Sequence, residues 1–117
     1  MSVSESGTPA GSYRVKTNCE VEATAAVIGG KWKPGILYHL IEGEKRFSEL
    51  QRLIPDASDR MLTRSLRELE EDSLISRTVY AEVPARVEYA LTDHGRKLIP
   101  VMEAMSAWGR AYGGFPD

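Results

Sequence analysis

The sequence predicts a mainly helical α+β fold in which two short helices joined by a tight turn are followed by a β-hairpin and a long last helix. Three observations support this fold. Apolar residues recur at helical spacing on both sides of a turn near residues 55–58, alternate with polar residues over residues 87–91, and return to helical spacing after residue 92. The 117 residues suffice for one domain with a single core.

The helix-turn-helix is the best-defined part of the sequence. Phe47, Leu50 and Ile54 form one apolar stripe of the first helix. Pro55 ends that helix because it has no backbone N–H to donate and its ring clashes with the preceding turn. Ser58 stands where an N-cap belongs, so it begins the second helix. The buried stripe of this second helix consists of Leu62, Leu66 and Leu69.

The outward face of the second helix carries basic and hydrogen-bonding side chains in its first turns. These side chains follow a spacing of i, i+3 or i+4, i+7, and they are Arg60, Thr63 or Arg64, and Arg67. The helix dipole favours cations at the other end, whereas a helix that points its N-terminal end into a DNA groove needs them early. Arginine–glutamate pairs at i, i+4 in the same helix suit any solvated helix, so this helix alone leaves both interpretations open.

The distribution of charge is compatible with DNA binding although the total is slightly acidic. The formal net charge is −2 and the pI is near 5.7, which argues against non-specific coating of nucleic acid. Residues 45–67 carry six basic residues against three acidic ones, a balance of +3, whereas residues 68–72 carry four acids. The charge is therefore segregated along the chain, and the acidic run is expected to be a solvated face.

Several classes of function are not expected. No apolar run approaches the roughly 20 residues of a membrane span, and no signal peptide is recognisable, so no membrane partner is expected. The single cysteine, Cys19, rules out an internal disulfide and fits a cytoplasmic location. His39 and His94 lie far apart and form no ligand cluster with it, so neither a metal nor a cofactor is predicted. No nucleophile stands at a motif spacing from a base, so an enzyme is not expected.

Two strands are predicted directly after the helix-turn-helix. One runs from Leu74 to about Ala81, residues 82–86 form a turn, and Val87 to Leu91 form a half-buried strand. A hairpin in this position is a wing, so the fold class is a winged helix-turn-helix. The domain is expected to span residues 18–113, between a disordered N-terminal arm at 1–17 and a tail at 114–117.

The first and last helices are predicted to flank this unit. Asn18 can cap the first helix, and Thr92 can cap the last one, which Pro100 should kink. The last helix has a seam with spacings of 3 and 4, formed by Leu98, Val101, Met105, Trp108 and Tyr112. Such a seam is expected to dock on a second subunit; the alternative is that it packs on its own chain through the first helix.

Four segments of the chain resemble a known family. They are Ile28-Gly29-Gly30-Lys31-Trp32, Arg46-Phe47-Ser48-Glu49-Leu50, Val83-Pro84-Ala85-Arg86-Val87-Glu88-Tyr89 and Leu91-Thr92-Asp93-His94-Gly95. In this order they are similar to the HxlR-type winged helix-turn-helix regulators, bacterial relatives of the MarR group, and the resemblance extends from about residue 19 to residue 108. It implies a homodimeric transcription factor with terminal dimerisation helices. Two departures are Ser73, where the family usually has Gly, and Gly35, where a large apolar residue is common.

The predicted function is a sequence-specific regulator that binds double-stranded DNA as a homodimer at an imperfect palindrome. The predicted DNA-binding residues are Arg46, Ser58, Arg60, Met61, Thr63, Arg64, Arg67 and Arg86. The predicted dimer interface contains Val21 and Ala25 of the first helix and the five seam residues of the last. The alternative is a protein-interaction module with the same fold.

Cys19 is the remaining candidate functional residue. It precedes the first helix, and several relatives in the resembled family carry a cysteine at this point, some of which sense oxidants or electrophiles. Thiols at helix N-termini are often reactive, so Cys19 is a candidate sensor in a repressor that responds to oxidants or electrophiles. The alternative is a small buried residue without a switching role. The identity of any effector stays open.

Overall fold

The computed structural model of the chain describes residues 17–115. In this range the helices are α1 Glu20–Ile28, α2 Lys33–Leu40, α3 Phe47–Leu53, α4 Asp59–Glu71, α5 Asp93–Arg96 and α6 Ile99–Gly113. The strands are β1 Lys45–Arg46, β2 Ile75–Tyr80 and β3 Arg86–Leu91, and they form one antiparallel sheet in the order β1-β3-β2. The predicted N-terminal arm, apart from Thr17, and the last two residues of the predicted tail lie outside the described residues.

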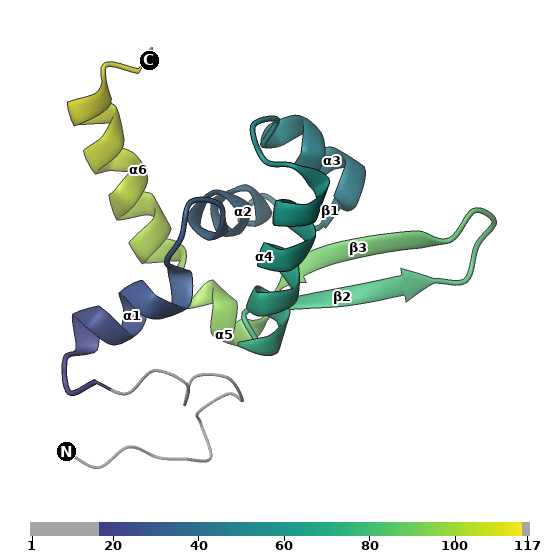
Figure 1. Cartoon of the computed structure of the whole chain (residues 1–117), viewed down its shortest axis with the longest axis horizontal. Coiled ribbons are helices and arrows are strands. Elements are labelled where there is room, and N and C mark those ends of the chain that lie inside the picture. The colour runs from purple at the N-terminus through teal and green to yellow at the C-terminus, as the bar shows by residue number, and fades with distance from the viewer. Residues whose placement is uncertain (1–16, 116–117) are drawn as a thin grey trace.

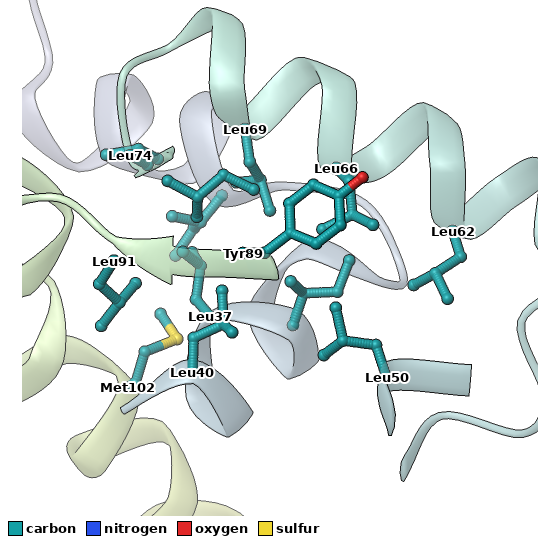
Figure 2. Close-up of a cluster of buried hydrophobic side chains, with 13 residues drawn as sticks. Leu37, Leu40, Leu50, Leu62, Leu66, Leu69, Leu74, Tyr89, Leu91 and Met102 are labelled. Carbon is teal, nitrogen blue, oxygen red and sulfur yellow. The ribbon is translucent and has the colours of Figure 1, made fainter. Parts of the chain in front are cut away.

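The structure confirms the predicted winged helix-turn-helix. Helices α2, α3 and α4 gather around one core, and the β2–β3 hairpin extends away from them as the wing (Figure 1). Figure 2 shows how α4 supplies the leucine stripe that lies over α2, α3 and the ring of Tyr89 from β3. The residues of this core that are almost fully buried include Ile36, Leu37, Leu50, Leu62, Leu66, Leu69, Leu74 and Ile75.

The turn between α4 and β2 contains Ser73, one of the two positions where this chain departs from the resembled family. Ser73 has a φ of 62°, so it occupies the left-handed region that usually takes glycine. The Ser73 N–H donates to the Glu70 carbonyl at 2.9 Å and the Leu74 N–H donates to the Leu69 carbonyl at 3.0 Å, the two hydrogen bonds of a Schellman cap. The Thr92 hydroxyl donates to the Ser73 carbonyl at 2.6 Å. The chain therefore keeps the glycine-type turn with a serine in it.

The second departure, Gly35, lines a groove between α2 and α6. The groove has a volume of about 500 Å³. Its lining residues are Pro34, Gly35, Tyr38, Met102, Met105, Ser106, Gly109, Arg110 and Phe115. A Cβ built on Gly35 would meet only the Ile54 side chain, at 3.9 Å. Residue 35 therefore has room for a Cβ without a clash.

Two element boundaries differ from the sequence-based expectation. Residues 45 and 46 form β1, a strand that sequence analysis does not predict, and their register places them against Tyr89 and Glu88. The last helix is broken at residues 97–98 rather than kinked within one run, and Pro100 stands in the first turn of α6. Proline cannot donate to the carbonyl four residues earlier, so it begins a helix more readily than it continues one.

The first helix starts one residue later than predicted. Its N-cap is Cys19 rather than Asn18, and no side-chain hydrogen bond caps it. Instead, the Cys19 N–H donates to the Thr17 hydroxyl oxygen at 3.0 Å, and that hydroxyl donates to Glu22 at 2.7 Å. The acceptor that orders this helix end therefore comes from outside the helix.

The predicted seam of the last helix divides into two parts. Leu98 and Val101 are partly buried against the core of their own chain, whereas Met105, Trp108 and Tyr112 are exposed. Helix α6 packs on α2, and its fully buried contact with the core is Met102, which is 3% exposed. The predicted seam did not include Met102. The far end of α6 points away from the rest of the domain (Figure 1).

The Ser73 turn generates a stability prediction. The substitution Ser73→Gly should raise the free energy of unfolding by about 0.5–1 kcal/mol, because relief of the left-handed strain exceeds the entropy that glycine adds to the unfolded chain. Urea denaturation measures this change. The matched control is Ser76→Gly within β2, where the same chemical change should lower stability by about 0.5–1 kcal/mol. Equal effects at both positions would contradict the role given to the Ser73 turn.

Candidate nucleic-acid interface

The start of α4 is held by two side-chain hydrogen bonds. The Ser58 hydroxyl oxygen accepts from the Met61 N–H at 3.1 Å, as an N-cap should. The Gln51 amide of α3 donates to the Asp59 carboxylate in the first turn of α4, at 2.6 Å. The first bond caps α4, and the second joins its first turn to α3.

The predicted recognition residues lie together on the exposed side of this helix. Arg60, Met61, Thr63, Arg64 and Arg67 are all exposed, opposite the buried leucine stripe. Arg60 and Arg67 make no ion pair within residues 17–115. Their guanidinium groups are therefore available to a ligand that approaches α4 from solvent.

Arg64 differs from its two neighbours because it shares a carboxylate with a residue that sequence analysis missed. Lys33, at the first position of α2, places its ammonium 2.7 Å from the Glu68 carboxylate, and the Arg64 Nε lies 3.4 Å from the other oxygen of Glu68. The side chain of Lys33 is only 10% exposed. The hydrogen bond from Lys33 holds the pKa of Glu68 below its ordinary value, Arg64 adds to this effect, and burial opposes it. The pair joins α2 to α4.

The wing arginine predicted to contact DNA already has partners on the protein. Arg86 lies 3.1 Å from Glu82 and 3.3 Å from Glu88, and its guanidinium stands over the ring of Tyr80 at 4.1 Å from the centroid. Arg46, also predicted to contact DNA, lies on the neighbouring strand with its Nε 3.8 Å from Glu88. Both predicted residues therefore belong to one charge network on the outer face of the sheet.

The residues predicted to form the dimer interface are mostly open to solvent in the single chain. The Trp108 side chain is 66% exposed and stacks on Tyr112 with ring centroids 4.7 Å apart. On α1, Val21 and Ala25 are exposed as well. Cys19 is a free, exposed cysteine next to them in sequence.

Within residues 17–115 there is no group of three or more His, Cys, Asp and Glu side chains that could hold a metal ion. No helix in that range is both long enough and apolar enough to span a bilayer.

This fold is a winged helix-turn-helix, and its helix α4 presents exposed arginines to solvent. The two features together are typical of one class of protein, the DNA-binding transcriptional regulators. The comparisons with known proteins specify the family. Residues 27–115 match the family model described as HxlR-like helix-turn-helix. The chain therefore belongs to the HxlR-like helix-turn-helix family, which confirms the predicted membership.

Individual relatives agree with this assignment. The chain is similar to the HTH-type transcriptional regulator YdeP of Bacillus subtilis, with 55% identity over 94 residues that cover 80% of this chain and 73% of YdeP. It is also similar to the redox regulator HypR in its oxidised form, with 49% identity, a TM-score of 0.78 and coverage of 85% of this chain and 99% of HypR. A MarR-family transcriptional regulator from Porphyromonas gingivalis is 34% identical, with a TM-score of 0.79 and coverage of 84% and 96%.

The contact between Lys33 and Glu68 generates a pH-dependent stability prediction. The substitution Glu68→Gln should lower the free energy of unfolding at pH 7, because it leaves the nearly buried Lys33 ammonium without its counter-charge. About a third of the Glu68 side chain is exposed, so solvent screening should limit the loss to about 1 kcal/mol. Urea denaturation at several pH values measures it.

The pH at which this loss disappears follows from the direction of the pKa shift. Since the pKa of Glu68 is depressed in the folded state, its contribution is complete above the ordinary value of 4.5 and is lost as the pH falls through the lower folded-state value. Wild type and Glu68→Gln should therefore converge below pH 4.5. Glu71→Gln, an exposed change three residues on, serves as the control and should stay within about 0.5 kcal/mol of wild type. A pH-independent loss would refute the electrostatic explanation.

Proposed function

We propose that this protein is a sequence-specific transcriptional regulator that binds double-stranded DNA as a homodimer in the cytoplasm, and that it acts by binding rather than by catalysis. The observation that carries the proposal is the exposed stripe on α4, where Arg60 and Arg67 have no partner within residues 17–115. Arginine can donate two hydrogen bonds to the O6 and N7 atoms of guanine, which suits it to reading bases in the major groove.

The recognition face consists of the predicted residues on α4, with Ser58 and Met61 at the end that enters the groove first. A single module of this size buries too little DNA surface for tight and selective binding. Two copies related by a two-fold axis would present two α4 helices one DNA turn apart, about 34–36 Å. We therefore expect the operator to be an imperfect palindrome with half-sites at that spacing.

A test of base reading is Arg67→Ala. Selection of binding sites from random duplex DNA with the wild-type protein first defines an operator. The variant should bind this operator at least about 30-fold more weakly and should discriminate less at one base pair of each half-site, because each of the two lost bidentate arginine–guanine contacts is worth about 1–3 kcal/mol. Fluorescence anisotropy measures both quantities.

The control for this test is Arg96→Ala, which removes an exposed arginine on α5 rather than α4. It should leave operator affinity within about twofold of wild type. If the selection enriches no sequence with the wild-type protein, the proposal fails and the alternative, a winged-helix module that docks on proteins, takes its place.

Dimerisation through α1 and α6 is part of the same proposal. Val21, Met105, Trp108 and Tyr112 are large apolar side chains left exposed by the single chain. The last three lie on α6, and exposed apolar side chains gathered on one helix are typical of protein contact sites. Burial of the stacked Trp108–Tyr112 pair against a second copy removes this surface from water and leaves the α4 stripes free for DNA.

The substitution Trp108→Asp should dissociate the dimer, because it places an unpaired charge in the proposed interface. Light scattering at micromolar protein concentration should give the mass of a dimer for wild type and of a monomer for the variant. The control Ala107→Asp introduces the same residue one position earlier, on an exposed face of α6 turned away from the Trp108 stripe, and should remain dimeric. A wild-type monomer at this concentration would contradict the dimer.

We further propose that Cys19 makes DNA binding responsive to oxidants. The supporting observations are its exposure at the start of α1 and the similarity to HypR, a redox regulator solved in oxidised and reduced forms. With one cysteine per chain, oxidation joins two Cys19 thiols of different subunits, or one Cys19 and a small thiol. Two thiols then lose two protons and two electrons to the oxidant, and one S–S bond forms.

The test compares wild type with Cys19→Ser before and after treatment with diamide. We expect diamide to change the operator affinity of wild type by at least fivefold and to leave the variant unchanged, and a reducing agent should restore wild type. Non-reducing mass spectrometry identifies the disulfide formed. Equal responses of both proteins, or none, would assign Cys19 a structural role only.

A further inference from the structure

We propose that Arg77, on β2, supplies the phosphate contact of the wing, and that Arg86 braces the wing rather than binding DNA. This inference rests on the proposed DNA-binding function and assigns a contact residue that sequence analysis did not identify. It follows from the different surroundings of the two wing arginines, which lie on opposite faces of the same hairpin.

The first step concerns the charge around Arg86. Glu82 and Glu88 both lie within 3.3 Å of its guanidinium, and the ring of Tyr80 covers one of its faces. Its side chain is 27% exposed. A phosphate would have to displace two carboxylates to reach it, and in doing so would bring a third negative charge close to them. The same Glu88 also faces Arg46, so the charges on this outer face of the sheet balance.

The second step concerns Arg77. Its register partner is Tyr89, whereas the neighbouring pairs Ser76–Ala90 and Thr78–Glu88 belong to the other face of the hairpin. The Tyr89 ring points toward α4 (Figure 2). Arg77, its register partner, therefore lies on the face of the sheet that is turned toward α4. It is exposed and makes no ion pair or side-chain hydrogen bond within residues 17–115. Arg77 is thus an uncompensated cation on the side of the wing that faces the recognition helix.

The third step concerns the position of β2 beside α4. One flank of α4 carries Glu68, which reaches Lys33 of α2. By helical phase, Thr63 and Glu70 lie on the opposite flank. The edge strand of the sheet, β2, packs against α4 on the side away from α2 (Figure 1). A duplex that receives the outward stripe of α4 in its major groove would have a phosphate backbone along this flank. Arg77 is then the wing cation that meets the backbone and offsets the repulsion from Glu70.

The experiment measures operator affinity as a function of salt concentration. For Arg77→Ala we expect at least about fivefold weaker binding at 0.15 M salt and a slope of log K against log[salt] that is smaller in magnitude by about 1.8, since each of the two subunits loses one phosphate contact. Arg77→Lys should keep the slope of wild type. The loss should be similar across operator variants, because a phosphate contact carries no base preference.

Arg86→Ala and Arg96→Ala serve as comparisons. Both should keep the wild-type salt slope, and Arg86→Ala should in addition speed amide hydrogen exchange in β2 and β3 if Arg86 braces the wing. If Arg86→Ala does not fold, Arg77→Ala and Arg77→Lys decide alone. An unchanged slope for Arg77→Ala overturns the inference.

The outcome also separates this inference from the proposed function. If Arg67→Ala changes base preference while Arg77→Ala has no effect, the protein reads DNA and only the wing contact is wrong. If wild type enriches no DNA sequence, the proposed function itself fails.

Discussion

Burial of one side of α4 is the constraint on which the rest of the structure depends. Leu62, Leu66 and Leu69 are at most 1% exposed, and together they fix the rotation of the helix about its own axis. A rotation of that helix would expose leucine side chains, each worth about 1.5–3 kcal/mol when buried. The opposite side, with Arg60 and Arg67, therefore faces solvent in one defined direction. The geometry of the interface is a consequence of core packing, and the Ser58 and Asp59 hydrogen bonds refine it.

The helix-turn-helix and the wing could be predicted because their signals are local. Leucine spacing, the Pro55 break, the Ser58 cap and the alternation in β3 each involve a few neighbouring residues. The Lys33–Glu68 pair could not be predicted in the same way, because its members are 35 positions apart and each looks like an ordinary surface residue. Asp72 illustrates the same limit: it ends an acidic run expected to be solvated, yet it is 1% exposed.

For the candidate interface, the sequence predicts which residues are involved but not which partners surround them. The sequence identified the arginines of α4 by their spacing, and the structure exposes them on one face. It also identified Arg86, but charge and motif do not reveal that two carboxylates and an aromatic ring surround it. Arg77 could not be predicted as a contact residue, because it lies in a strand that contains no recognisable motif. Which cations are already neutralised is a property of the three-dimensional arrangement.

The break between α5 and α6 determines how motion could travel through the molecule. A continuous last helix would act as a rigid rod between the wing and the exposed Trp108, whereas two helices separated at residues 97–98 are joined by a short pivot. Helix α6 packs on α2, and Lys33 of α2 forms an ion pair with Glu68 of α4. The contacts of the single chain thus connect α6 to α4 through α2, and the wing lies outside this series of contacts.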